Sequence, residues 1–233
     1  TVDDLVWIKS LVAERVRDGG TLVLNADDSG SHRMAGLERV DVSRLNLVLF
    51  GLDPTTGPLA EHLLAGGKGY YVQGGWLVES ERGRERSVAR LVDTPLTMDG
   101  RARFQVQNAL AAAAAARALG VPRETVAMGL ATFRSQQNSG RVNVYAHGRG
   151  YVFVDYGHNE AAVRAAGELL AGWSGSLVGI VGVPGDRTDE LISNTARAAA
   201  SAFPHVVLRE DDDLRGRAQG EGAELMRGVI ETA

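Results

Sequence analysis

The fold of the second half of the chain is decided by the stretch Tyr151-Val152-Phe153-Val154-Asp155-Tyr156-Gly157-His158-Asn159. Its β-favouring residues predict a strand that ends at Asp155, and a polar turn follows. The pattern then repeats: we expect a helix over 160–170, an apolar strand over 176–183, a helix over 189–202 and a strand over 205–208. Strands and helices alternating at this spacing predict βαβ units and a parallel sheet.

Ligands of such sheets bind at the carboxyl ends of the strands, where this sequence places three polar clusters. In the first, Asp155 could accept both hydroxyls of a ribose while an aromatic ring stacks on a base, or it could form an ordinary strand-end turn. In the second, Gly185-Asp186-Arg187 could bind an anion at a helix N-terminus, or Asp186 could cap that helix. The acids of residues 210–213 could bind a cationic substrate group or form a solvated charge run.

The first half of the chain reads as a separate region, with a polar, breaker-rich boundary at 135–140. Leu5, Ile8, Val12 and Val16 recur at helical spacing and predict one apolar face of an N-terminal helix. The further elements expected are strands over 21–24 and 45–50, a hairpin of 70–72 with 76–78, a solvated loop or edge strand over 79–90, and helices over 108–119 and 123–133.

Composition excludes several classes of protein. The 233 residues include no cysteine, which excludes disulfides, thiolate metal sites and cysteine nucleophiles. The net charge of −4 gives no overall basic surface for nucleic acid, and no apolar stretch approaches the roughly 20 residues of a membrane span. The N-terminal residues lack a secretory signal. We therefore expect a cytoplasmic protein without nucleic-acid or membrane partners.

Two further patterns bear on chemistry. Only Lys9 and Lys68 are lysines among the 25 basic residues, and a lysine can be carbamylated where an arginine cannot, although Lys9 could equally face solvent. The five histidines show no metal-ligand spacing. The chain contains no G-x-x-x-x-G-K-[ST] phosphate loop, and neither a hydrolase nor a dinucleotide motif stands at a convincing strand–helix junction.

Seven stretches together resemble the ATP-dependent Mur ligases, and within them the Mur-ligase-like, arginine-adding part of cyanophycin synthetases. They occur in family order with family-like gaps and cover nearly the whole chain. They lie at residues 1–12, 20–28, 104–112, 139–143, 154–159, 182–190 and 210–217. The resemblance implies an α/β chain in which residues 1–138 are the C-terminal part of a Mur ligase central (ATPase) domain. Residues 139–233 would be a truncated, Rossmann-like C-terminal domain with a mostly parallel sheet.

The resemblance also implies the reaction. ATP and Mg²⁺ would convert a carboxylate to an acyl phosphate, which an amine then attacks to form an amide. In the cyanophycin synthetases this part adds arginine to the aspartate side chains of a poly-aspartate backbone. The partners implied are an amino acid and an aspartate-containing acceptor, with a homo-oligomer possible. Because acyl-phosphate chemistry depends mostly on positioning and charge neutralisation, the polar clusters suit it.

Residue by residue, the resemblance assigns roles to matching positions. Lys9 matches a lysine whose carbamate helps to hold Mg²⁺. Arg141 matches an arginine that reaches the ATP phosphates. The remaining nucleotide positions are Asn108 near the adenine, Asp155 at the ribose, and Tyr156 and His158 beside the nucleotide. The predicted substrate positions are Gly185, Asp186 and Arg187, which face the cleft, and Asp211, Arg215 and Arg217, which meet the incoming amino acid.

The sequence also departs from the family pattern. Gln105, Ser139 and Gly157 replace the usual asparagine, proline and alanine, and the phosphate loop is missing. We therefore expect the chain to be a fragment or the ordered part of a longer protein, inactive by itself. Two alternatives stay open: another Mur-type cell-wall or folate-type ligase, and a non-catalytic nucleotide-binding paralogue.

Overall fold

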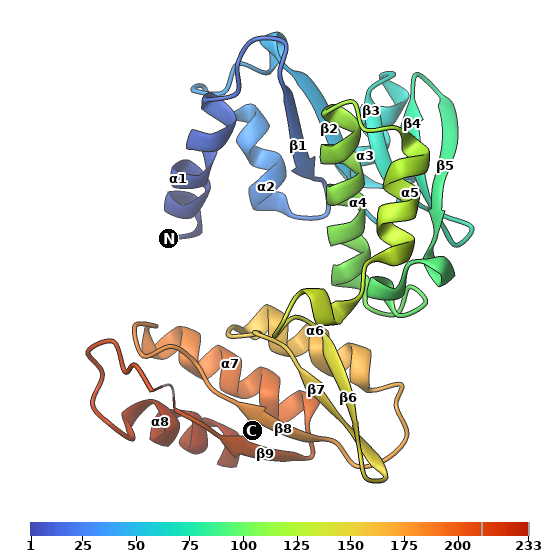
Figure 1. Cartoon of the computed structure of the whole chain (residues 1–233). Helices are drawn as coiled ribbons and strands as arrows, with labels where there is room; N and C mark the ends of the chain where they lie inside the picture. Colours follow the sequence, from blue (N-terminus) through green and yellow to red (C-terminus); the bar gives the residue numbers. More distant parts are fainter. Residues whose placement is uncertain (211, 233) are drawn as a thin grey trace. The chain divides into compact units, whose positions relative to one another are not determined.

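The computed structural model describes residues 1–210 and 212–232. The chain divides into two compact units, Thr1–Gln137 and Asn138–Ala233. In Figure 1 the first unit runs from blue to green and the second from yellow to red.

Unit 1 is built on a mixed five-stranded sheet in the order β1-β2-β3-β4-β5. β1, β2 and β3 pair in parallel, and β4 pairs antiparallel with both β3 and β5. The strands are β1 (Thr21–Asn25), β2 (Asn46–Phe50), β3 (Lys68–Gln73), β4 (Trp76–Glu81) and β5 (Arg84–Arg90). The helices are α1 (Val2–Glu14), α2 (Ser29–Arg33), α3 (Gly57–Leu64), α4 (Arg103–Ala118) and α5 (Arg123–Thr132).

Helices cover both faces of this sheet. The alanine-rich helix α4 packs Ala109, Leu110 and Ala113 against Phe50 and Tyr70, because small side chains let a helix approach a sheet closely. On the opposite face, α1 and α3 contribute to a second core that contains Leu22, Leu49 and Tyr71. The predicted strands and the β3–β4 hairpin are confirmed, and α4 begins five residues before its predicted start.

The structure differs from two expectations for unit 1, and from the second only in part. The N-terminal helix does not bury its predicted face: Leu5, Ile8 and Val12 are exposed, while Val6, Ser10 and Ala13 are buried. Ser10 tolerates burial because its hydroxyl donates to the carbonyl of Trp7. Residues 79–90 are also not uniformly solvated. β5 is an edge strand as expected, but Glu79 lies in β4 and is only 5% exposed.

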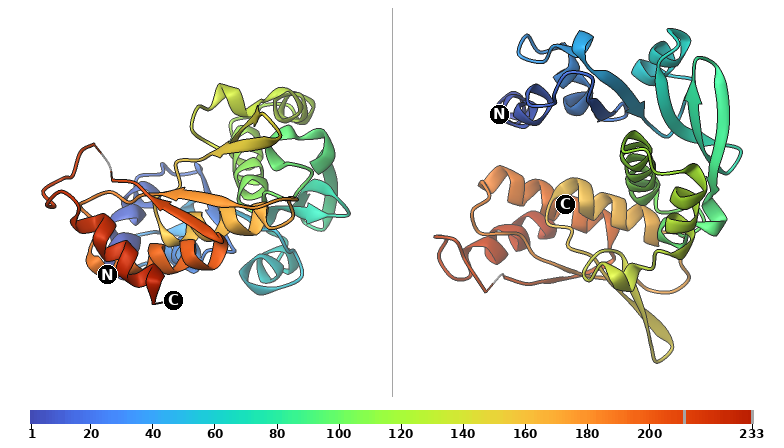
Figure 2. Two further views of the ribbon diagram at one scale, coloured as in Figure 1. Left: turned by 90° about the horizontal axis from the view of Figure 1, so that it is seen from below. Right: turned by 45° about the horizontal axis from the view of Figure 1, so that its top comes forward.

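Unit 2 contains the strand–helix alternation. Its helices are α6 (Glu160–Leu170), α7 (Asp189–Ala202) and α8 (Glu221–Glu231), and the predicted bounds of α6 and α7 are confirmed. The strands are β6 (Asn143–His147), β7 (Gly150–Val154), β8 (Val178–Val181) and β9 (His205–Leu208). The first two form an antiparallel hairpin, and the last two form a parallel pair. Figure 2 shows α6 and α7 side by side.

The hairpin of β6 and β7 is the topological feature that the sequence did not predict. The hydrogen-bonded partner of β7 is β6, and within the described residues no ladder joins β7 to β8. The core beneath β8 and β9 is formed by Ile192 and Ala199 of α7 with Met226 of α8. Helices therefore hold the carboxyl ends of β7, β8 and β9 in place. Among the described residues, no helix is long and apolar enough to cross a bilayer.

Candidate functional site

The first predicted cluster lies where β7 ends. Both carboxylate oxygens of Asp155 accept backbone amides: Oδ2 from Val142 at 3.0 Å and Oδ1 from Gly157 at 2.8 Å. The Asp155 side chain therefore ties the segment after Arg141 to the end of the strand. A carboxylate offers about four lone-pair sites, so Asp155 keeps acceptor capacity for a ligand hydroxyl.

Aromatic and cationic side chains gather beside Asp155. The guanidinium carbon of Arg141 lies 5.0 Å from the centre of the Tyr156 ring, a cation–π contact. The His158 ring meets the same tyrosine edge-on, with 5.3 Å between ring centres. Tyr156 is 58% exposed, so much of its surface is accessible to a ligand. The structure thus brings Arg141, Asp155, Tyr156 and His158 close together, and their role at a nucleotide stays a prediction.

The second and third clusters meet each other. The loop after β8 and the loop after β9 approach so closely that a Cβ on Gly185 would lie 2.0 Å from the carbonyl oxygen of Leu214. A Cβ on Gly182 would similarly lie 2.5 Å from the carbonyl oxygen of Arg209. Glycine is required at both positions because no side chain fits between these backbones. Across the same junction, Arg215 reaches the carboxylate of Asp186 at 3.2 Å.

Arg217 lies at the centre of this junction, and its side chain is only 13% exposed. Its Nε donates to the carbonyl of Gly185 at 3.2 Å, and one terminal nitrogen donates to the carbonyl of Arg187 at 2.9 Å. The terminal nitrogens also pair with Asp189 at 2.9 Å and with Glu221 at 3.0 Å. We call these five residues the Arg217 cluster. All three guanidinium nitrogens are engaged within the protein.

Arg215 differs from Arg217, although it is only two residues away. It occupies a left-handed backbone conformation with φ 48°, followed by Gly216 with φ 91°, in a tight turn closed by the amide of Arg217 and the carbonyl of Leu214. Its guanidinium is 42% exposed and lies near Asp186 and Asp213. The hydrogen bond and charge of Asp186 raise the pKa of Arg215 above its usual value.

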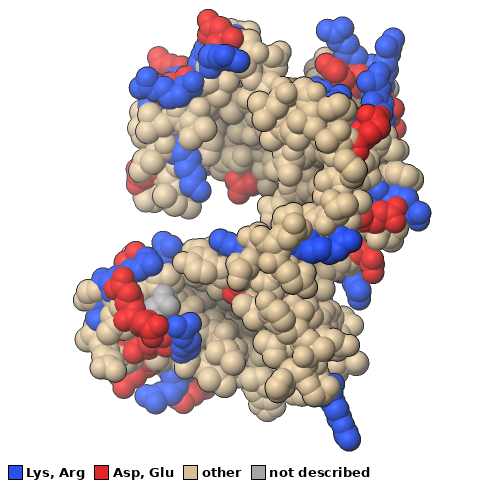
Figure 3. Space-filling model, in the orientation of Figure 1, with Lys and Arg blue, Asp and Glu red and all other residues tan. Residues whose placement is uncertain are grey.

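The other predicted substrate positions, Asp186, Arg187 and Asp211, differ in their surroundings. Asp186 does not cap α7, because the cap is the Thr188 hydroxyl, which accepts the amide of Leu191. The Nε of Arg187 is buried and has no hydrogen-bond partner within the described residues. Asp212 is fully exposed near Arg209, and Asp211 lies outside the described residues. In the view of Figure 3, acidic and basic side chains lie next to one another over this part of unit 2.

In unit 1, both predicted site residues are exposed. Lys9 has no ion-pair partner among the described residues, and Asn108 donates to the side chain of Gln105 at 3.0 Å. Asp27, which contacts the residue that precedes Asn108, was not among the predicted site residues. Asp27, at the end of β1, accepts the amide of Leu52 at 2.9 Å and the side chain of Gln107 at 2.8 Å. The signal for it was the pair of aspartates that follows a buried strand.

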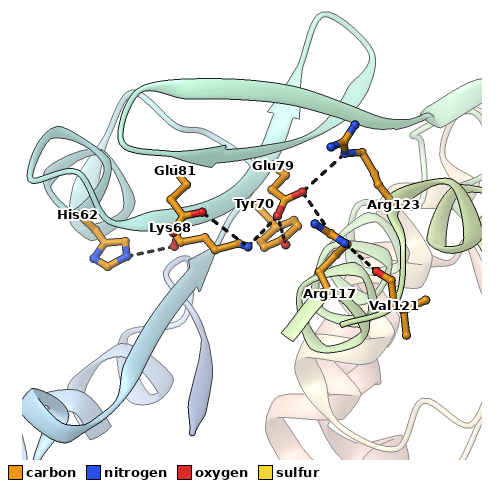
Figure 4. A network of polar contacts seen from close by, with 8 residues as sticks. All are labelled: His62, Lys68, Tyr70, Glu79, Glu81, Arg117, Val121 and Arg123. Carbon is orange, nitrogen blue, oxygen red and sulfur yellow. Dashed lines mark hydrogen bonds and ion pairs between the residues drawn. The ribbon is translucent and has the colours of Figure 1, made fainter. Parts of the chain in front are cut away.

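Unit 1 also holds a buried charge network that sequence reasoning missed (Figure 4). Glu79 accepts the Tyr70 hydroxyl at 2.9 Å and pairs with Lys68 at 2.7 Å. Arg117 at 3.4 Å and Arg123 at 3.7 Å complete what we call the Glu79 cluster. Burial works to raise the pKa of Glu79, but the hydrogen bonds from Lys68 and Tyr70 and the charge of Arg117 hold it below its usual value.

The described residues offer few ligands for a metal ion. Among residues 1–210 and 212–232, no group of three or more His, Asp or Glu side chains is placed to hold a metal ion. Lys9 could contribute one ligand if carbamylated, but a single ligand does not make a site. Mg²⁺ commonly binds through one or two protein ligands together with waters and substrate phosphates. A Mg²⁺ ion fits this chain only in that form.

Comparison with known proteins adds the evolutionary context. Residues 140–232 match the family model described as Mur ligase, glutamate ligase domain. The chain is 38% identical to the cyanophycin synthetase of Trichormus variabilis and 35% identical to that of Synechocystis sp., in each case over 99% of this chain and 26% of the relative. The chain thus spans about a quarter of the length of these curated relatives.

Solved structures show the same fold. The structure of a murein peptide ligase from Psychrobacter arcticus matches with a TM-score of 0.66 at 15% identity, covering 99% of this chain and 45% of that one. The matched family model includes the carboxyl edge of β7 and the Arg217 cluster. Residues 140–232 therefore form a C-terminal domain of the Mur ligase family, and the chain as a whole is related to the cyanophycin synthetases.

Proposed function

We propose that this chain is part of an ATP-dependent carbon–nitrogen ligase that adds arginine to the aspartate side chains of a poly-aspartate backbone. The observation that carries the proposal is a pair of polar clusters in unit 2: a nucleotide-type cluster follows β7, and a mixed-charge junction follows β8 and β9. The similarity to cyanophycin synthetases over nearly the whole chain supports the choice of substrates. We place the protein in the cytoplasm, with a homo-oligomer possible and with no nucleic-acid or membrane partner.

The cluster at β7 suits a nucleotide. Asp155 would accept the ribose hydroxyls with the lone pairs left by its two backbone amides. Tyr156 and His158 offer aromatic surface beside it, and the Arg141 guanidinium supplies positive charge toward phosphates. In unit 1, Asn108 would lie near the adenine, and Lys9 would serve as the carbamylated Mg²⁺ ligand.

The junction after β8 and β9 suits an amino acid, because it presents both signs of charge within a short distance. The exposed Arg215 guanidinium is placed to meet a carboxylate, while Asp186 and Asp213 are placed to meet a cationic side chain. Asp211, Gly185, Arg187 and Arg217 are the other positions that we assign to this substrate region. A substrate with a carboxylate and a guanidinium, such as arginine, matches this pattern.

Bound ATP with Mg²⁺ would supply the phosphoryl group that activates the acceptor carboxylate. The residues of this chain would orient the nucleotide, neutralise phosphate charge through Arg141, and hold the incoming amine beside the activated carbonyl. Because the sequence contains no phosphate-loop motif, we propose that the chain alone does not turn over.

Calorimetric titration with a non-hydrolysable ATP analogue tests the nucleotide site. We expect D155N to weaken binding at least about tenfold, equivalent to about 1.4 kcal/mol, because a charged acceptor is lost. The matched control is D212N, which changes a fully exposed side chain of the same unit. Equal affinity for D155N and the wild type, with the thermal stability of the variant unchanged, would argue against the site.

A turnover assay separates the candidate functions. The chain is incubated with ATP, Mg²⁺, L-arginine and an aspartate oligomer, and ADP and the amide product are measured. We expect nucleotide binding without product. Amide formation by this chain alone would contradict the predicted inactivity and exclude the non-catalytic alternative. Faster ADP release with a different amino acid, such as glutamate, would point instead to another Mur-type or folate-type ligase.

A further inference from the structure

We propose that Arg217 is a positioning residue, which fixes the loops that follow β8 and β9 as one rigid unit and does not itself contact the ligand. The inference deepens the proposed function, on which it rests for the identity of the ligand. It separates the roles of two arginines that the sequence treats alike. Arg215 faces the ligand, and Arg217 holds the backbone from which Arg215 and Asp186 project.

The guanidinium of Arg217 is nearly saturated with hydrogen bonds inside the protein. Its Nε and both terminal nitrogens are hydrogen-bonded to two backbone carbonyls and two carboxylates, at distances between 2.9 and 3.2 Å. A guanidinium has five N–H donors and no acceptor, so four such contacts leave little donor capacity for a substrate. Its 13% exposure leaves little surface for one either.

The four acceptors of Arg217 lie in two separate segments of the chain. Gly185, Arg187 and Asp189 belong to the loop after β8 and the start of α7, while Glu221 begins α8. Arg217 thus joins segments about 30 residues apart in the chain. A lysine cannot replace it, because an ammonium is a point charge without the planar fork that reaches several acceptors at fixed angles.

Arg217 also adjoins the turn that carries Arg215. Arg215 adopts a left-handed conformation that is uncommon for residues other than glycine, asparagine and aspartate. Arg217 closes that turn by donating its amide to Leu214 at 3.0 Å, while its side chain holds the opposite loop. Strained backbone persists where the surrounding structure fixes it. The backbone amide of Arg217 closes the turn that carries Arg215, and the Arg217 side chain holds the loop that carries Asp186, the ion-pair partner of Arg215.

Amide hydrogen exchange in the 233-residue chain tests the positioning role without any ligand. Two reporters are the amide of Arg187, which donates to Pro184, and that of Gly220, which donates to Glu210. We expect R217K to raise exchange at both at least about tenfold while amides within α6 keep their protection, since only the loops lose their tie. R217A should do the same or more. The matched control, R227A, changes an exposed arginine of α8 and should leave both reporters unchanged.

A second readout distinguishes positioning from general stability. We expect R217K to weaken L-arginine binding at least about tenfold while affinity for the ATP analogue at the β7 cluster stays within about twofold. R215G should instead leave the two exchange reporters unchanged, because glycine adopts the left-handed conformation without strain and Arg217 still holds the loops. It should still weaken L-arginine binding, because it removes a ligand-facing group.

The proposal is overturned if R217K exchanges like the wild type at both reporters or binds L-arginine with wild-type affinity. It is also overturned if R217K weakens L-arginine and ATP-analogue binding equally, because that is general destabilisation. If the wild type binds no L-arginine, the proposed substrate is wrong. The exchange experiment then still decides whether Arg217 fixes the loops, so the two failures can be told apart.

Discussion

The Glu79 cluster of unit 1 and the Arg217 cluster of unit 2 are built on the same principle with opposite charge. In the first, a carboxylate only 5% exposed is surrounded by three cations and a hydroxyl. In the second, a guanidinium 13% exposed is surrounded by four oxygen groups. Each central charge is compensated, because an unpaired buried charge is strongly unfavourable.

The two clusters differ in what they connect. The partners of Glu79 lie on β3, α4 and α5, so that cluster joins the sheet to its covering helices. Arg217 itself lies in the loop after β9, and its partners lie in the loop after β8 and at the first residues of α7 and α8. The Glu79 cluster is therefore expected to control the stability of the fold, and the Arg217 cluster the shape of the site. Four predictions test this difference, and they begin with the largest expected effect.

Removing the charge of Glu79 should destabilise unit 1. We expect E79Q to lower the free energy of unfolding by about 3 kcal/mol, because three cations lose their shared partner in a largely buried setting. Chemical denaturation measures the loss. The control is E124Q, whose side chain is 82% exposed beside Arg123 and should change stability by less than about 0.5 kcal/mol. A loss that is equally small for E79Q would show that the cluster does not support the fold.

Adding one methyl group at Gly185 should disturb the junction of the two loops. We expect G185A to cost about 2 kcal/mol, because the new Cβ would lie 2.0 Å from the Leu214 oxygen and the backbones must separate. The matched change G228A, in α8 with open space around it, should instead stabilise by about 0.5 kcal/mol. Thermal unfolding of both variants measures the difference in stability. If G228A destabilised the protein and G185A did not, the close contact at Gly185 would not be important for the fold.

The stability of unit 1 should depend on pH through Glu79. Its pKa in the folded protein lies below the ordinary value of 4.5, so its contribution is fully present above about pH 4.5 and is lost as the pH falls through the folded pKa. Urea unfolding at pH 7 and at pH 3.5 should therefore show a smaller difference for E79Q than for the wild type. An equal acid-induced loss in both proteins would assign it to other carboxylates.

The smallest expected effect on stability is that of R215G. Glycine relieves the left-handed strain but makes the unfolded chain more flexible, so we expect a change within about 1 kcal/mol of zero. Its ion pair with Asp186 is half-exposed and contributes little. Denaturation of R215G beside R217A measures the contrast. A loss for R215G as large as that for R217A would remove the distinction between the two arginines.

Local patterns in the sequence predicted much of unit 2. The bounds of α6 and α7 follow from helix propensity and from side chains that cap their own helices, and these signals lie within a few residues. The grouping of Asp155 with its neighbours follows from their adjacency after one strand. The β6–β7 hairpin was missed because residues 143–147 carry no distinctive strand pattern. Their pairing depends on contact with β7.

The sequence by itself determined the alternation of strands and helices, the positions of the strand ends and the family to which residues 140–232 belong. Only the tertiary structure decided which face of α1 is buried, that Glu79 is internal, and that Arg217 is saturated while Arg215 is not. The physical reason is distance along the chain. A helix or turn is fixed by interactions within a few residues, whereas the partners of Glu79 and Arg217 include residues as far away in the chain as Arg123 and Arg187, respectively. Folding alone brings those side chains together.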